Sequence, residues 1–201
     1  MLDDEYLFDE NGQHTGTVEK SGEHYGTVAG KDGEKASHFK FADPVNDPKA
    51  IDEGKVTEVK FVEMESVSEA LETSGVNDEA NQDNKYEFIM NESDASNPDG
   101  EGKMDYVVTA KVGIDGKKEP IARNNALYIT QTKDGNVAHN SNNLGNFMWG
   151  AGARALGFSL TTARLGAHAN NMLDPHYGGL DSSDDQFSIK LGYMWNKSQG
   201  K

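Results

Sequence analysis

The sequence predicts an α+β protein, with antiparallel β-hairpins at the N-terminus and then a small sheet packed against three C-terminal helices. Short alternating segments separated by Asn-Gly and Asp-Gly fill residues 1–41, two strong strand patterns follow, and a helical period begins at Asn142. This pattern divides the chain into a β-rich acidic connector, residues 1–60, and an α+β domain, residues 61–201.

Four short strands are expected in the N-terminal region, at a spacing of about ten residues. Asn11-Gly12 separates the first pair and Asp32-Gly33 the second. Both dipeptides suit tight turns because their residues tolerate a positive φ. The predicted strands are Tyr6–Phe8, Thr15–Val18, His24–Val28 and His38–Phe41.

The middle of the chain mixes strands and helices. A helix is expected from Ser66, with Glu69 placed for a capping box, and Gly75 ends it. Further strands are predicted at Lys55–Val62, Tyr106–Val112 and Ala126–Gln131, and a second helix at about residues 78–90.

Three helices are predicted after Asn142. The first is rich in glycine and alanine, which allow a neighbouring helix or a ligand to approach closely. Gly157 is a natural residue to end it, Ser159 caps the second helix, and Ser182 or Ser183 caps the third. The predicted ranges are about Leu144–Leu156, Leu160–Met172 and Asp184–Trp195.

Charge and composition exclude several classes of protein. The net charge is −15, with eight basic against twenty-five acidic residues in 1–100, and eleven against nine in 101–201. The first half should therefore repel nucleic acid and anionic membranes. No segment is apolar enough to predict a transmembrane helix, and the first residues lack the basic and apolar regions of a signal peptide.

The residues and motifs that the sequence lacks exclude several kinds of catalytic and metal site. There is no cysteine, which excludes disulfides, thiolate zinc sites and a cysteine nucleophile. HExxH, GxSxG, phosphate-binding and dinucleotide-binding loops are also missing, and the histidines are scattered. We therefore expect no metal and no cofactor.

The second predicted C-terminal helix offers the first candidate site. Arg164 and Asn171 lie four residues before and three after His168, so the three share one helix face. Such a group could supply a general base or acid, a positioning amide and an anion-binding guanidinium. The alternative is a partly exposed histidine in a hydrogen-bond network between helices.

Acidic and amide residues form the other candidates. Asp184, Asp185 and Gln186 open the third helix, where capping needs at most one aspartate. Asp105, close to Lys103, follows a glycine-containing loop and could reach a cleft, or could be a solvated strand end. His139 and Asn146 belong to an amide-rich segment that suits substrate binding or ordinary loop and cap contacts.

Two parts of the sequence resemble polymorphic toxins. The opening DDEYLFDENGQHTGTVEK, with FKFADPVNDPKAI further on, resembles the segment after the repeat core of Rhs/YD-repeat toxins. Residues 81–195 are similar to polymorphic toxin type 44, through KMDY at Lys103–Tyr106, GNFMWGAGARALGFS at Gly145–Ser159 and LDSSDDQFSIKLGY at Leu180–Tyr193.

This resemblance implies a secreted or delivered antibacterial effector in interbacterial competition. It would be released from a larger Rhs parent chain and neutralised by a cognate immunity protein. The family is described as a predicted ribonuclease. The residues at its recurring motif positions are Asp105, Asn146, Trp149, Gly150, Asp184, Asp185 and Gln186, whereas His168 lies outside them.

The expected reaction is metal-independent RNA cleavage. His168 or Asp105 would take the 2′-OH proton, Arg164 and Asn146 would stabilise the phosphorane, and a second acid would protonate the 5′ oxygen. The near-neutral second half is poor in basic residues for a nuclease. Two alternatives therefore stay open: a glycan hydrolase that uses Asp105 with Asp184 or Asp185 on peptidoglycan, and a non-catalytic cell-surface binding module.

Overall fold

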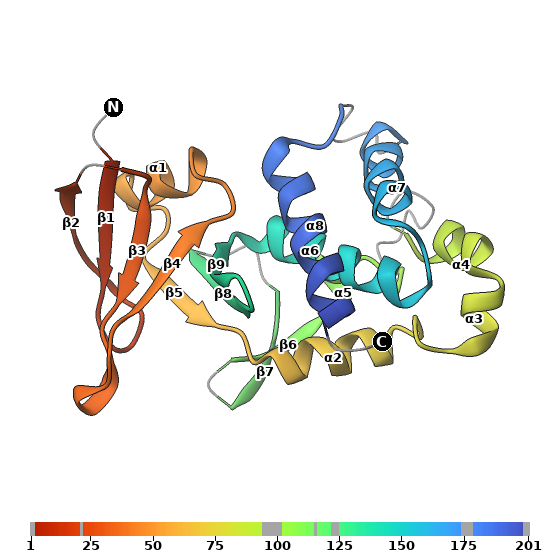
Figure 1. The fold of residues 1–201 in the computed structure, drawn as a ribbon, viewed down its shortest axis with the longest axis horizontal. Helices are drawn as coiled ribbons and strands as arrows, with labels where there is room; N and C mark the ends of the chain where they lie inside the picture. Colours follow the sequence, from red (N-terminus) through yellow and green to blue (C-terminus); the bar gives the residue numbers. More distant parts are fainter. Residues whose placement is uncertain are drawn as a thin grey trace. The chain divides into compact units, whose positions relative to one another are not determined.

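The structure is a computed structural model that describes residues 3–20, 22–93, 102–114, 116–121, 125–173 and 179–198. It confirms the α+β class. The chain forms two compact units (Figure 1). The first contains Met1–Val62 and Arg123–Ser141, and the second contains Glu63–Ala122 and Asn142–Lys201.

The first unit is a curled, seven-stranded mixed sheet with one α-helix, α1 (Asn46–Asp52), and a short 3-10 helix, η1 (Lys31–Gly33). The predicted hairpins are confirmed: β1 (Asp3–Phe8) pairs with β2 (His14–Lys20), and β3 (Tyr25–Val28) pairs with β4 (Ser37–Phe41). Gly12 and Gly33 adopt the positive φ that their turns require. Parallel pairings join β1 to β3, β4 to β9 (Gly135–His139) and β5 (Glu58–Phe61) to β8 (Ala126–Thr132). The strand order in the sheet is β2-β1-β3-β4-β9-β8-β5.

The two ends of this sheet meet at the β1–β2 turn. The backbone N–H of Val59 in β5 donates to the carbonyl of Gly12 at 2.8 Å, and the N–H of His14 donates to the carbonyl of Thr57, also at 2.8 Å. A Cβ at Gly12 would overlap the Val59 carbonyl. Glycine is therefore needed here both for its φ of 79° and for the close approach that curls the sheet.

Aromatic side chains fill the inside of the curled sheet. Phe39 lies 5.8 Å from Phe8 and 5.4 Å from Phe41 between ring centroids, and Phe41 lies 5.6 Å from Tyr6. All four rings are buried, and Ile51 of α1 joins the same core. Burial of these large apolar surfaces is the main stabilisation of the unit.

The predicted boundary at residue 60 did not anticipate the return of the chain to the first unit. Residues 126–132 form a strand as predicted, but it pairs with β5 and β9 in the first unit's sheet. Its first five residues are all buried, which fits a central strand covered on both faces. A parallel partner distant in the sequence leaves no local signal.

The second unit is mainly helical and has one small hairpin, β6–β7. Gly75, with a φ of 84°, follows the end of α2 as predicted. The elements are α2 (Met64–Thr73), α3 (Glu79–Asp83), α4 (Lys85–Glu92), α5 (Tyr106–Thr109), β6 (Lys111–Ile114), β7 (Lys117–Pro120), α6 (Ser141–Ala155, from the unit boundary), α7 (Leu160–Leu173) and α8 (Ser183–Ser198).

Two predictions of strand and helix bounds in this unit were wrong. The strand predicted from Tyr106 begins only at Lys111, because residues 106–109 form α5, where Val107 fills the space beside Gly145 of α6. The helix predicted for residues 78–90 is broken at Asn84, which has non-helical φ and ψ. Tertiary packing overrides local propensity at α5.

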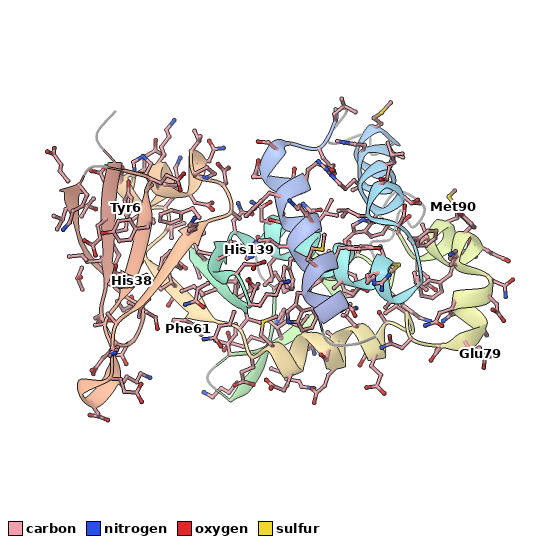
Figure 2. All side chains as sticks on the ribbon, viewed as in Figure 1. Tyr6, His38, Phe61, Glu79, Met90 and His139 are labelled. Carbon is pink, nitrogen blue, oxygen red and sulfur yellow. The ribbon has the colours of Figure 1, made fainter. Side chains whose placement is uncertain are left out.

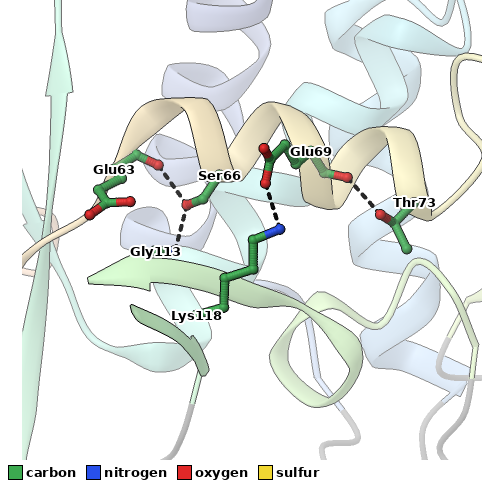
Figure 3. Close-up of polar contacts among 6 residues, drawn as sticks. All are labelled: Glu63, Ser66, Glu69, Thr73, Gly113 and Lys118. Carbon is green, nitrogen blue, oxygen red and sulfur yellow. Dashed lines mark hydrogen bonds and ion pairs between the residues drawn. The ribbon is translucent and has the colours of Figure 1, made fainter. Parts of the chain in front are cut away.

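The capping box predicted at Ser66 and Glu69 does not form. Glu63 occupies the N-cap position of α2, and the Ser66 hydroxyl lies inside the helix (Figure 3). That hydroxyl donates to the Glu63 carbonyl at 2.6 Å and accepts from the Gly113 N–H at 2.5 Å, which links α2 to β6. Glu69 instead forms an ion pair with Lys118 of β7 at 2.6 Å.

The three C-terminal helices follow their predicted bounds closely. Gly157 ends α6 with a φ of 76°, and the Ser159 hydroxyl accepts from the Thr162 N–H at 3.1 Å to cap α7. Helices α6 and α8 contact each other through glycine, since a Cβ at Gly150 would overlap the backbone of Ile189 and one at Gly192 would overlap the backbone of Phe147. This contact brings polar side chains at the helix ends together.

Candidate functional site

Polar side chains from α6 and α7 converge on the first turn of α8 in the second unit. The predicted residues Asn146, Arg164, His168, Asp184, Asp185 and Gln186 meet here, and Asn143, Asp181 and Ser182 complete the group. We call these nine residues the polar cluster.

Asp185 has a structural role in the polar cluster. Its Oδ2 accepts from the Ser182 hydroxyl at 2.6 Å and from the Ser182 N–H at 3.1 Å, while the Asp185 N–H donates back to that hydroxyl at 3.3 Å. This reciprocal pair is a capping box and confirms Ser182 as the cap of α8. The Asn146 amide donates to the other oxygen, Oδ1, at 2.7 Å, so Asp185 ties α6 to α8 through both carboxylate oxygens.

Asp184 has fewer partners than its neighbour. Its Oδ2 accepts from the Asn143 amide at 3.0 Å, and within the described residues Oδ1 accepts no hydrogen bond. The side chain is half-buried and Asn143 is buried. Of the two predicted aspartates, Asp184 therefore retains an oxygen that can accept a proton.

Arg164 is oriented by a buried glutamine. Its Nε donates to Oε1 of Gln186 at 2.6 Å, and Nε2 of Gln186 donates to Oδ2 of Asp181 at 2.6 Å. Gln186 is only 6% exposed, whereas Arg164 is exposed. Because the glutamine contact uses Nε, the two Nη groups can donate to an anion in the fork geometry that guanidinium provides.

His168 is held in one orientation by the segment before α8. The backbone N–H of Asp181 donates to Nδ1 of His168 at 3.1 Å. A nitrogen that accepts a hydrogen bond carries no proton, so the neutral ring carries its proton on Nε2. In this tautomer Nε2 is a hydrogen-bond donor, and the arrangement does not support the general-base role considered for His168.

Three other predicted residues, His139, Lys103 and Asp105, do not join the polar cluster. His139 ends β9 in the first unit (labelled in Figure 2), where it is fully buried and its Nε2 lies 3.0 Å from the Thr130 hydroxyl. Burial lowers the pKa of His139 from 6.5 to about 3, so it is a neutral core residue.

Lys103 and Asp105 belong to the second unit. Lys103 forms an ion pair with Glu92 at 3.8 Å, and the backbone carbonyl of Asp105 accepts hydrogen bonds from N–H groups of α5.

The last two predicted site residues are Trp149 and Asn171. The Trp149 indole N–H donates to the carbonyl of Ala163 at 3.1 Å, so this residue joins α6 to α7 instead of facing a ligand. Asn171 belongs to α7, but its side chain lies outside the described residues.

The sequence did not single out Asp181 for the polar cluster. Its backbone N–H orients His168 and its carboxylate orients Gln186. The one available signal was its position immediately before the Ser182 cap.

Among the residues that the structure describes, no three histidine, aspartate or glutamate side chains gather as a possible metal-ligand set. None of the helices in the described part of the chain combines the length and apolar character needed to cross a lipid bilayer.

Comparisons with known proteins give no assignment. No family model, curated protein or solved structure matches this chain.

Proposed function

We propose that this protein is a delivered antibacterial toxin that cleaves RNA without a metal ion, with the polar cluster as its active site. The observation that carries the proposal is the anchoring of Arg164 and His168 to one segment, residues 181–186. The two side chains lie one turn apart on α7, and both present donors next to a helix start that bears Asp184. The resemblance to polymorphic toxin type 44 supports the same function.

In this mechanism the substrate lies across the N-terminal end of α8. Oδ1 of Asp184 takes the proton from a ribose 2′-OH, and the 2′ oxygen attacks the adjacent phosphorus. The bond from phosphorus to the 5′ oxygen breaks, water protonates that oxygen, and a 2′,3′-cyclic phosphate remains. Arg164 and the Nε2–H of His168 donate to the non-bridging phosphate oxygens, whose charge grows in the transition state.

The direct test is incubation of the purified chain with total RNA in the presence of EDTA. The wild type should produce fragments that end in 2′,3′-cyclic phosphate. Asp184→Asn should reduce the rate by about 10²–10⁴-fold, the usual contribution of a general base. Asp134→Asn removes an exposed carboxylate from the first unit and should cleave as the wild type does.

Other results would redirect the proposal. Equal cleavage by Asp184→Asn and the wild type would remove Asp184 as the base. Intact RNA together with degraded peptidoglycan would favour the glycan hydrolase, and inactivity on both substrates would favour a binding module. Growth arrest on cytoplasmic expression, relieved by Asp184→Asn, would support a toxin.

The proposal includes two partners. As a delivered toxin, the chain would be released from a larger Rhs parent and bound by a cognate immunity protein in the producing cell. Both are implied by the sequence resemblance, and a pull-down from the producing cells, with the Asp184→Asn chain as bait, tests the second.

A further inference from the structure

A pocket of about 290 Å³ lies elsewhere in the second unit. One wall is the face of α2 that carries Glu69 and Thr73, and the opposite wall combines α5 with the β6–β7 hairpin. Tyr106 lies against it, fully buried, with its hydroxyl 3.1 Å from that of Ser74. Burial raises the pKa of Tyr106, so the phenol stays neutral there.

Three lysines line this pocket against a single glutamate. Lys103 precedes α5, Lys111 begins β6 and Lys118 belongs to β7, so they come from three separate places in the chain. Glu69 pairs with Lys118 at 2.6 Å (Figure 3), and the Lys103–Glu92 pair is long, at 3.8 Å. Lys111 forms no ion pair with any described residue.

This excess of positive charge is unusual for a chain with a net charge of −15. Acidic residues outnumber basic ones over the whole chain, 34 to 19, yet three lysines and one described carboxylate line this pocket. The three lysines are exposed to solvent at the pocket rim, where their like charges repel one another. An anionic ligand would remove this repulsion.

We propose that the pocket binds a small molecule that carries a diphosphate group. Lysine ammonium groups are common phosphate ligands and act as point charges that need no fixed fork geometry. The volume lies near the lower limit for small-molecule sites, which suits a compact anion. The apolar lining from Ala70 and Ala110 leaves room for a small organic part of the ligand.

This ligand would bind at a place distinct from the polar cluster. None of the lysines belongs to the cluster, and no cluster residue lines the pocket. One wall does contact α6, because Val107 of α5 fills the space beside Gly145. Occupation of the pocket could therefore stabilise the helix that carries Asn143 and Asn146.

The test is calorimetric titration of the full chain with inorganic pyrophosphate at low salt. Lys111→Gln and Lys118→Gln should each weaken binding roughly tenfold, as expected for the loss of one charge-assisted hydrogen bond. Glu69→Gln should tighten binding, because it removes the one carboxylate among the described lining residues and releases Lys118. Lys117→Gln is the matched control, since Lys117 neighbours Lys118 on β7 but does not line the pocket.

Several results would overturn the proposal. Absence of pyrophosphate binding by the wild type would do so, as would equal weakening by Lys117→Gln and Lys118→Gln. Binding lost in Arg164→Gln but retained in Lys118→Gln would place the anion in the polar cluster instead. Circular dichroism and thermal unfolding of each variant identify any that misfold, and Glu69→Gln tests the pocket without removal of a lysine.

Discussion

The two units pack their central elements in different ways. In the first unit, the rings of Tyr6, Phe8, Phe39 and Phe41 contact one another edge-on or tilted inside a curled sheet. In the second, α6 and α8 contact each other where Gly150 and Gly192 provide no side chain at all. The first arrangement fills space, whereas the second removes side chains so that two backbones can approach.

The close contact of α6 and α8 explains why polar groups gather beside it. Gly150 lies four residues after Asn146, and Ile189 lies four residues after Asp185. The glycine contact is therefore one helical turn from the Asn146–Asp185 hydrogen bond. A polar side chain in the first unit, such as His139, is instead enclosed and kept neutral.

The largest expected effect is the loss of a ring from the first unit. Phe39→Ala should lower the free energy of unfolding by about 3–5 kcal/mol, because it leaves a cavity beside Phe8 and Phe41. Hydrogen exchange of peptides from β3 and β4 measures this. Val18→Ala, at an exposed β2 position, should change stability by at most about 0.5 kcal/mol. Equal effects would contradict the assigned core.

Acid should destabilise the first unit through His139. Unfolded histidine binds a proton near pH 6.5, but the pKa of folded His139 is about 3. Its contribution is complete above pH 6.5 and is lost as pH falls from 6.5 towards 3, at up to about 1.4 kcal/mol per pH unit. Urea unfolding of the full chain, followed by hydrogen exchange of peptides from the first unit, gives the free energy of unfolding at each pH. His139→Gln should reduce the slope of that free energy against pH. An unchanged slope would show that His139 is not neutral and buried.

A methyl group at the α6–α8 contact should separate the two helices. Gly150→Ala should cost about 1–3 kcal/mol, as for other overpacked sites, and should lower RNA cleavage because the polar cluster shifts. Gly166→Ala is the control. Its Cβ would lie 3.3 Å from the Trp149 ring, and the better helix propensity of alanine, about 1 kcal/mol, offsets that contact. Equal melting temperatures for Gly150→Ala and Gly166→Ala would contradict the close approach of α6 and α8 at Gly150.

The smallest expected effect concerns the cap of α8. Ser182→Ala should cost about 1 kcal/mol, because the Asp185 N–H loses its acceptor and the Asp185 carboxylate loses a donor. Ser183→Ala, one residue further on, leaves the capping box intact and should be close to neutral. Denaturant titration distinguishes them, and a cost at Ser183 equal to that at Ser182 would place the cap elsewhere.

Local chemistry made much of this fold predictable. Asn11-Gly12 and Asp32-Gly33 specify their turns through backbone conformation, and Ser159 and Ser182 specify helix starts through one hydroxyl each. These signals act over a few residues, so the sequence pattern contains them. The placement of Arg164 and His168 on one face of α7 was predictable for the same reason, since helix spacing fixes which residues share a face, but the approach of both to α8 was not.

Long-range pairing could not be predicted in the same way. The parallel pairings of β8 with β5 and of β9 with β4 depend on partners more than sixty residues away. Similarly, the β-branched residues Val107, Val108 and Thr109 favour a strand, but α5 forms where Val107 meets Gly145. The role of His168 depends on one backbone N–H from Asp181, which no spacing rule reveals.

The insertion of residues 63–122 into the first unit has a consequence for synthesis of the protein. Strands β4 and β5 leave the ribosome well before β8 and β9, which lie between them in the finished sheet. At roughly 5–20 residues per second, this delay lasts several seconds or more. During that interval, aromatic side chains and open strand edges are exposed to chaperones and to neighbouring chains. A fragment cut at residue 60 would keep that exposure permanently, because it lacks both central strands.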